Sequence, residues 1–197
     1  PIPIPRLKPM NATNASIPAA PVGNPKRKKA LTTVARVVVL SSIGAHNDGN
    51  GPVTLMRHVE DAVRAQLPNV LALRPAYFME NFLGNLGTIR SDGAWYMPQP
   101  ADTKMPLVAT RDIARVAAEE LRATWSGHRY RGIHGPEDLS MGEVADILTG
   151  VLERNVSFVS VPLEGALDGM RGAGVPEFVV SLYRGMLEGL GNGRMVP

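Results

Sequence analysis

The stretch from Ser41 to Asp48 concentrates side chains that can do acid–base or nucleophilic chemistry: Ser41, Ser42, His46 and Asp48. The last three are the residue types of a hydrolytic triad, in which a histidine takes the proton of a serine nucleophile and a carboxylate orients the histidine. All three fall within seven residues, and the chain has no Gly-x-Ser-x-Gly turn that would expose such a nucleophile. A hydrolase of esters or lactones that uses Ser42 is therefore a secondary hypothesis.

Side chains that could bind a metal ion are scattered along the chain. His46, Asp48, His128 and His134 have none of the spacings that metal sites show, and an Asn/Asp/Gly-rich loop explains the first pair without a metal. The absence of cysteine excludes disulfides, thiolate metal ligands and a cysteine nucleophile. We therefore predict no metal site.

A strand must position the serine pair. The run at residues 36–42, "RVVVLSS", is rich in β-branched residues and alternates too little for a one-sided strand, which predicts a parallel strand buried on both faces. Ser41 and Ser42 then stand at its carboxyl end, where open α/β sheets bind their ligands. The alternative role of the two hydroxyl groups is to satisfy backbone amides of the loop.

Helices and strands alternate along the rest of the chain. Apolar residues spaced on one face predict an amphipathic helix over residues 53–66, and Pro75 stops a second apolar strand at residues 69–75. The later patterns predict a short helix at 76–86, an extended piece at 93–100, a brief strand before a helix at about 110–125, a strand at 130–135, a capped helix at 140–153, a strand at 156–162 and a mostly helical end. Ser140 and Glu143 form the capping box of the helix at 140–153. Such alternation specifies an α/β fold with a mostly parallel sheet and flanking helices.

The first 29 residues differ from the rest in composition. Residues 1–25 hold seven of the 17 prolines, and seven basic residues precede the first acidic one, Asp48. This predicts an irregular, solvated, Pro-rich basic arm at 1–29, and it makes a nucleic-acid role unlikely because no aromatic residue accompanies the basic run "KRKK". The chain contains neither a long apolar span nor a secretory signal, so we expect a cytoplasmic protein with no membrane segment.

Five segments in order resemble one family: "VVVLSSIGAHNDGNGPV", "MRHVEDAVR", "NVLALRPAYFMENFLGNL", "VATRDIARVAAEEL" and "HGPEDLSMGEVADILTGVL". Together they resemble the C-terminal two-thirds of an NmrA-like protein, an atypical branch of the short-chain dehydrogenase/reductases. The resemblance covers residues 30–197, and it implies a truncated Rossmann-like domain with C-terminal substrate-side helices and a reductase that uses NADP or NAD.

The same resemblance implies a glycine-rich turn that lets a backbone approach the cofactor pyrophosphate. No such turn joins a strand to a helix here, because the glycine cluster "GLGNGR" at residues 189–194 follows a helix and is typical of a helix end. We therefore expect impaired or absent dinucleotide binding. A cofactor-independent small-molecule-binding or regulatory protein is the first alternative.

The resemblance also assigns site residues. It places Pro75, Ala76, Tyr77 and Phe78 at the cofactor, with Asn81 beside them, and it puts His58 where many relatives have a lysine that points into the site. We add Ser41 at the cofactor, His46 and Asn81 at the substrate, and Ser42 and His58 in catalysis. Simpler roles in turns and in the core remain open for all of them, and an exposed or packing role remains open for His58. No Tyr-x-x-x-Lys pair occurs, so the proton donor is unassigned. Asp112 resembles a residue that caps the following helix.

The family resemblance also implies an unprotected sheet edge. In the strand order 3-2-1-4-5-6, loss of the first three strands leaves the run at residues 36–42 as an apolar edge. The Pro-rich arm is a poor strand because proline cannot donate to a ladder. We therefore expect a homodimer formed through this edge, with a small molecule as the other partner.

Overall fold

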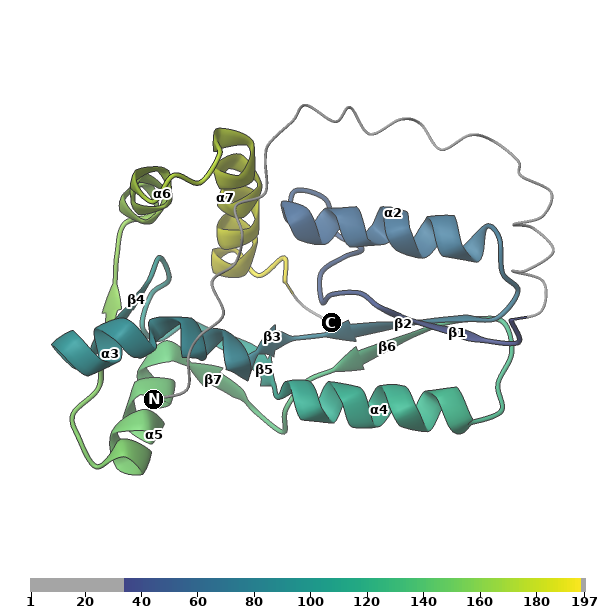
Figure 1. Cartoon of the computed structure of the whole chain (residues 1–197), viewed down its shortest axis with the longest axis horizontal. Coiled ribbons are helices and arrows are strands. Elements are labelled where there is room, and N and C mark those ends of the chain that lie inside the picture. The colour runs from purple at the N-terminus through teal and green to yellow at the C-terminus, as the bar shows by residue number, and fades with distance from the viewer. Residues whose placement is uncertain (1–33, 196–197) are drawn as a thin grey trace, which may run out of the picture. The chain divides into compact units, whose positions relative to one another are not determined.

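The structure, a computed structural model, describes residues 34–195, and the arm predicted at residues 1–29 lies outside them. A parallel sheet in the order β1-β2-β6 forms the first half of the described fold. Its strands are β1 (Val37–Leu40), β2 (Val70–Pro75) and β6 (His128–Ile133). Figure 1 shows helix α2 (Pro52–Arg64) on one side of this sheet and helix α4 (Thr110–Arg122) on the other. The predicted α/β, Rossmann-like fold is thereby confirmed.

Strand β1 is shorter and more exposed than the sequence pattern predicts. It pairs only with β2 among the described residues, in the register Val37 to Val70 through Leu40 to Leu73. Its side chains are half-buried, and Leu40 is 53% exposed. The prediction of a strand buried on both faces is wrong because no described strand covers the outer edge of β1. The edge position itself agrees with the strand order expected from the sequence.

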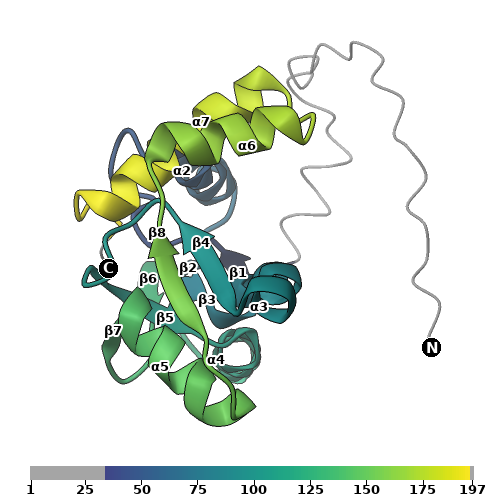
Figure 2. The ribbon, with the colours of Figure 1, turned by 90° about the vertical axis from the view of Figure 1, so that its left-hand side faces the viewer.

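The second half of the described fold contains shorter pairings. Strand β5 (Lys104–Val108) lies between β3 (Tyr77–Phe78), which is parallel to it, and β7 (Asp138–Ser140), which is antiparallel. Strand β4 (Ala94–Met97) pairs in parallel with β8 (Ser157–Ser160). Figure 2 shows this last pair between helix α5 (Met141–Leu152) and the two final helices, α6 (Leu163–Gly172) and α7 (Glu177–Gly191).

The helix predicted at residues 76–86 is divided into three elements. Tyr77 and Phe78 are extended because they pair with Leu107 and Val108 of β5. A 3-10 helix, η1 (Met79–Asn85), and helix α3 (Leu86–Asp92) follow. A pairing partner that lies about 30 residues away in the chain thus overrides the local helical pattern.

The ends of the helices test two sequence predictions. The capping box of α5 is confirmed: Ser140 N donates to Glu143 at 2.7 Å and Glu143 N donates to Ser140 Oγ at 3.2 Å. Asp112 lies in the first turn of α4 as predicted, where its charge favours the helix dipole, but the predicted capping hydrogen bond does not form and its carboxylate pairs with Arg115 at 3.3 Å. The carboxylate of Glu80, from η1, instead accepts the Thr110 N–H at the start of α4, at 2.9 and 3.0 Å.

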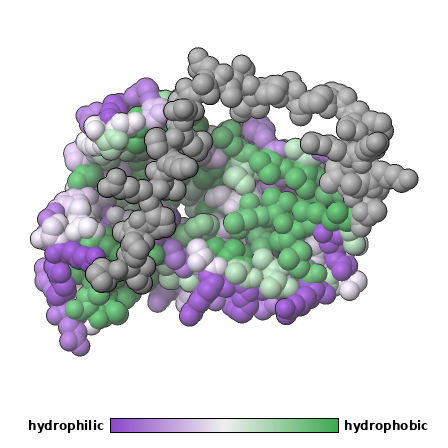
Figure 3. All heavy atoms as spheres, viewed as in Figure 1, coloured by the Kyte–Doolittle hydropathy of each residue, from purple (hydrophilic) through white to green (hydrophobic). Residues whose placement is uncertain are grey.

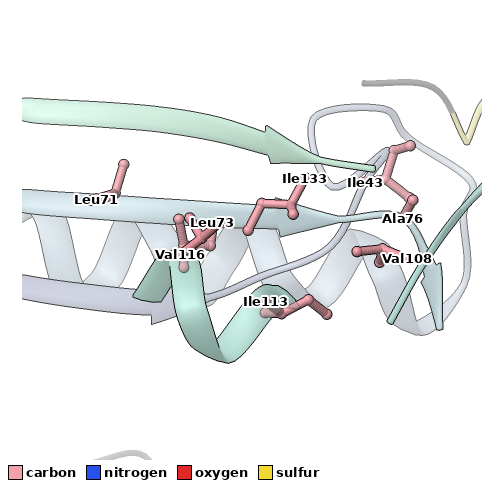
Figure 4. Packing of buried hydrophobic residues seen from close by; sticks show 8 residues of the cluster. All are labelled: Ile43, Leu71, Leu73, Ala76, Val108, Ile113, Val116 and Ile133. Atoms are coloured by element: carbon pink, nitrogen blue, oxygen red, sulfur yellow. The ribbon is translucent and has the colours of Figure 1, made fainter. Parts of the chain in front are cut away.

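Two buried clusters hold the described elements together. The first joins β2, β6 and α4 to the loop after β1, and Figure 4 shows its eight residues: Ile43, Leu71, Leu73, Ala76, Val108, Ile113, Val116 and Ile133. The second surrounds Trp95, which is 1% exposed, and joins β4, β5 and α5. No helix within residues 34–195 is long and apolar enough to cross a membrane.

Candidate functional site

A cavity of about 560 Å³ lies where the sheet ends and α7 begins to cover it. Its volume is in the usual range for small-molecule sites, about 300–1,000 Å³. The loop after β1, the segment after β2, strands β5 and β7, helix α7 and the final residues contribute its lining: Ser42, Ile43, Val53, Ala76, Tyr77, Phe78, Asn81, Lys104, Met105, Pro106, His134, Asp138, Tyr183, Met186, Leu190, Gly193 and Met195. Open α/β sheets bind ligands at this carboxyl edge.

Helix α7 forms one wall by packing closely on the start of α2. Gly51, the N-cap of α2, has φ +56°, and a Cβ added there would lie 1.9 Å from the carbonyl oxygen of Leu182. Across this contact, a Cβ added at Gly185 would lie 3.1 Å from the backbone nitrogen of Gly51. Two glycines therefore let the helices approach, and this approach brings Tyr183 and Met186 of α7 to the cavity.

The chain end beyond α7 closes another side of the cavity. The backbone carbonyl of Arg194 accepts the side-chain amide of Asn47 at 2.7 Å and that of Asn50 at 3.2 Å. Met195 lines the cavity and packs on the first core cluster. Helix α7 itself runs through Gly191, as the interpretation of the glycine cluster as a helix end predicts.

Tyr77 is the half-buried phenol of this cavity. Burial raises the pKa of Tyr77, a hydrogen bond with the Asn81 side chain opposes the increase, and the nearby phenol of Tyr183 adds to it. The Tyr77 ring also packs against Phe82, with centroids 5.7 Å apart. Because the net direction is upward, Tyr77 remains a protonated phenol at neutral pH.

A buried carboxylate network lies beside the cavity. Glu60 of α2 is 0% exposed and accepts Ser41 Oγ at 2.5 Å. Arg74 of β2 donates to both of its oxygens, at 3.0 and 2.8 Å, and Arg64 lies 3.4 Å away. The two guanidinium groups in turn stack on the ring of Tyr130, at 4.1 and 3.8 Å from its centroid. The network ties α2 to β2, β6 and the end of β1.

Burial tends to raise the pKa of Glu60, but its partners outweigh that effect. The hydrogen bonds from Arg74 and Ser41 and the charges of both arginines hold the pKa of this carboxyl below its ordinary value. Glu60 is therefore ionised at neutral pH, and its role is to fix positions rather than to exchange protons. No sequence pattern links Ser41 to Glu60 and Arg74, because the three residues lie on different elements.

The residue types of a hydrolytic triad do not come together. Ser42 donates to the backbone carbonyl of Ile43 at 3.2 Å, His46 Nδ1 lies 3.4 Å from Arg74, and Asp48 pairs with Arg57 at 3.3 Å. Each of the three thus has a partner outside the set. This arrangement provides no base for Ser42.

The structure brings together some of the predicted site residues and separates others. Ser42, Ala76, Tyr77, Phe78 and Asn81 line the cavity. The others lie elsewhere: Ser41 is buried against Glu60, Pro75 is buried in β2, and His46 and His58 are exposed and do not line the cavity.

Residues that sequence patterns do not place at the site are the α7 wall and Lys104, His134 and Asp138, from the short strands and their loops. They come from separate parts of the chain, and only the fold brings them together. The apolar positions of α7 carry no local pattern of a binding site. The feature of the sequence that could have indicated the α7 wall is the pair Gly51 and Gly185, because glycine occurs where two backbones approach closely.

Comparison with known proteins identifies the family. The sequence model of the NmrA-like family matches residues 56–185, which is more than half of the chain. The chain belongs to the NmrA-like family.

Other NmrA-like proteins resemble the chain over its matched part. An NAD(P)H azoreductase from Xenophilus azovorans is 34% identical over 161 residues, which cover 76% of this chain and 54% of that protein. An agroclavine dehydrogenase from Claviceps fusiformis is 35% identical over 130 residues, covering 64% and 44%. The chain thus spans about half the length of the curated relatives it matches.

Solved structures share the fold. The NADPH complex of the quinone oxidoreductase QOR2 from Escherichia coli aligns with a TM-score of 0.71 at 17% identity, covering 91% of this chain and 65% of that one. Triphenylmethane reductase from Citrobacter sp., in complex with NADP(H), aligns with a TM-score of 0.69 at 20% identity, covering 86% and 59%.

The loop from β1 to α2 tests whether the described residues fit a dinucleotide. It joins a strand to a helix and contains Gly44 and Gly51 with φ of +72° and +56°. A Cβ at Gly44 would lie 2.9 Å from the carbonyl oxygen of Arg194, as one at Gly51 would meet α7. The chain's own backbone therefore fills the space beside these two glycines. Within residues 34–195, the cavity has the volume of a ring-sized ligand, and this loop leaves no room for a phosphate beside Gly44 or Gly51.

Proposed function

We propose that this NmrA-like protein is a reductase of a small organic substrate that depends on NAD(P)H and that binds the dinucleotide weakly. The observation that carries the proposal is the cavity at the carboxyl edge of the sheet, lined by Ala76, Tyr77 and Phe78. These residues belong to the segment that, in relatives, faces the nicotinamide. The filled loop between β1 and α2 supports the weak binding.

The described residues have separable roles in this proposal. Ala76 and Phe78 would hold the nicotinamide end, and the cofactor, when bound, supplies a hydride. Met105, Met186 and Leu190 provide an apolar enclosure that excludes water from a bound substrate. Tyr77 and Asn81 provide polar groups that orient it.

The names of relatives indicate a substrate class. The azoreductase name specifies an azo compound, and the quinone oxidoreductase name specifies a quinone. Both are conjugated electron acceptors whose nitrogen or oxygen lone pairs can accept a hydrogen bond. A lining that combines methionine and aromatic side chains suits such planar molecules, because thioether groups make favourable contacts with aromatic rings.

Acceptor-dependent oxidation of NADPH, followed by its absorbance, tests the proposal. We expect turnover with azo or quinone acceptors that saturates only at high NADPH concentration. Met186→Trp fills the cavity and should abolish turnover, whereas Phe178→Trp, on the same helix at a position 71% exposed, should not affect it. Absence of turnover with every acceptor, or equal turnover by both variants, would count against the proposal.

The cofactor-independent alternative has a distinct signature. A binding or regulatory protein would bind aromatic ligands in the cavity, with Met186→Trp blocking them, and would oxidise no NADPH. The hydrolytic alternative is not favoured by any contact of Ser42, because its hydroxyl donates to Ile43.

A further inference from the structure

Most polar side chains of the cavity already have partners. Ser42 donates to the carbonyl of Ile43, Lys104 Nζ lies 3.2 Å from Glu143, and His134 Nδ1 lies 2.9 Å from the carbonyl of Gly135. Tyr183 is 41% exposed and borders solvent. Tyr77 differs from all of them, because it is a half-buried residue of the cavity wall whose hydroxyl makes no geometrically defined hydrogen bond to an acceptor among residues 34–195.

Asn81 is the polar neighbour of the Tyr77 hydroxyl. It lies four residues further along the chain, in η1, and its side-chain amide can donate to the phenolic oxygen. In that arrangement the O–H of Tyr77 is available to a ligand in the cavity.

Packing fixes the ring that carries this hydroxyl. Tyr77 is held in β3 by its backbone pairing with Leu107, and its ring contacts Phe82, which contacts Trp95 at a centroid distance of 5.0 Å. Trp95 is the centre of the second core cluster. The phenol thus projects from a rigid part of the fold, which favours a defined hydrogen-bond direction.

We propose that the Tyr77 hydroxyl donates a hydrogen bond, and during reduction a proton, to the carbonyl oxygen of an uncharged aromatic ligand bound in the cavity. The hydrogen-bonding part stands on the cavity alone, and the proton transfer rests on the proposed function. In that step a hydride, which a bound reduced nicotinamide would supply, adds to one end of the conjugated carbonyl system. The displaced π-electron pair takes the phenolic proton at oxygen, and water returns a proton to the phenolate.

Binding without cofactor tests the hydrogen bond directly. Equilibrium dialysis compares 2-methyl-1,4-naphthoquinone with 2-methylnaphthalene, which has the same carbon skeleton and no acceptor. Because the chain has no cysteine, the quinone cannot arylate a thiol. Tyr77→Phe should weaken quinone binding about fivefold and leave hydrocarbon binding unchanged, since one neutral hydrogen bond is lost.

The control variant is Tyr96→Phe, which makes the same chemical change outside the cavity, on β4. It should leave both affinities unchanged. Asn81→Leu provides a second test that keeps the Tyr77 ring and hydroxyl. Ultraviolet titration of the four tyrosines should then show one phenol that titrates higher than in the unaltered protein.

Kinetics separate the two proposals. If the protein turns over a quinone, Tyr77→Phe should lower kcat by about 100-fold or more and remove the solvent isotope effect, as loss of a general acid does. If nothing is turned over but quinone affinity depends on Tyr77, the reductase proposal fails and the hydrogen bond stands. Equal quinone binding and turnover by the unaltered protein and Tyr77→Phe would overturn the inference, as would the absence of quinone binding.

Discussion

Replacement of Glu60 by glutamine is the most revealing perturbation of the network beside the cavity. Glutamine keeps the size of the side chain but removes its charge and replaces one acceptor oxygen by a donor NH₂ group. With the amide oxygen at the Oε1 position, the bonds from Ser41 and Arg74 Nε remain, but the NH₂ group faces Arg74 and Arg64 nitrogen donors at 2.8 and 3.4 Å. In the opposite orientation of the amide, the NH₂ group faces the donor Arg74 Nε instead.

The expected cost follows from these contacts. At least one charge-assisted hydrogen bond is lost, worth about 1.5–3 kcal/mol. Two guanidinium groups with side chains only 14% and 10% exposed also lose their counter-charge. Breaking a buried pair in this way costs about 3–5 kcal/mol. We therefore expect Glu60→Gln to lower the free energy of unfolding by about 3 kcal/mol or more at neutral pH.

The stabilisation that the Glu60 carboxylate provides should depend on pH. Because the pKa of Glu60 is lower in the folded protein than in the unfolded chain, its stabilisation is complete above the unfolded pKa and is lost as pH falls through the folded one. Urea unfolding followed by circular dichroism should show the deficit of Glu60→Gln shrinking from about pH 5 towards about pH 3. Glu119→Gln, at an exposed ion pair, should change little. Equal stability at neutral pH, or a deficit that does not depend on pH, would refute this account of Glu60.

Three further predictions concern the α7 wall, the sheet edge and the serine. Gly51→Ala adds a Cβ that would lie 1.9 Å from the Leu182 carbonyl oxygen, at a residue with φ +56°. It should lower the free energy of unfolding by about 3 kcal/mol or more and speed hydrogen exchange in α7. The control Gly169→Ala has open space around it in α6 and should raise the free energy of unfolding by about 0.5–1 kcal/mol. We propose that the edge of β1, where Leu40 is 53% exposed, pairs with a second copy. Figure 3 shows apolar side chains gathered on the half of this face that contains the β1-β2-β6 sheet and α2. Sedimentation velocity at micromolar concentration should show a dimer, and a stable monomer would contradict it. On an ester and lactone panel neither the unaltered protein nor Ser42→Ala should be active, and hydrolysis that is lost in the variant would revive the hydrolase hypothesis.

The sequence predicts those elements whose pattern is local. The helix over residues 53–66 becomes α2, and the helix beginning at Thr110 becomes α4, because each carries a one-sided apolar stripe. The capping box of Ser140 and Glu143 forms because both partners lie within one turn. The segment Ala76–Phe78 lines the cavity, and its predicted contact with a cofactor stays a prediction.

Features that depend on contacts between residues far apart in the chain cannot be predicted from local sequence patterns. Tyr77 and Phe78 are extended because of β5, and Glu60 becomes an anchor because β2 brings Arg74 to it. The α7 wall of the cavity depends on the approach of Gly185 to Gly51, residues that lie far apart in the chain. Hydrophobic periodicity carries no information about contacts between distant segments, so only the folded structure shows which residues form the cavity together.

We propose that residues 34–195 hold the nicotinamide end and the substrate but offer no pyrophosphate site. Fluorescence titration of the chain with NADPH and, in parallel, with reduced nicotinamide mononucleotide tests this claim most directly. The account predicts weak dissociation constants that agree within about threefold, because the adenosine phosphate half gains no contact. Low-micromolar binding of NADPH that is 100-fold or more tighter than binding of the mononucleotide, about 2.7 kcal/mol, would contradict it.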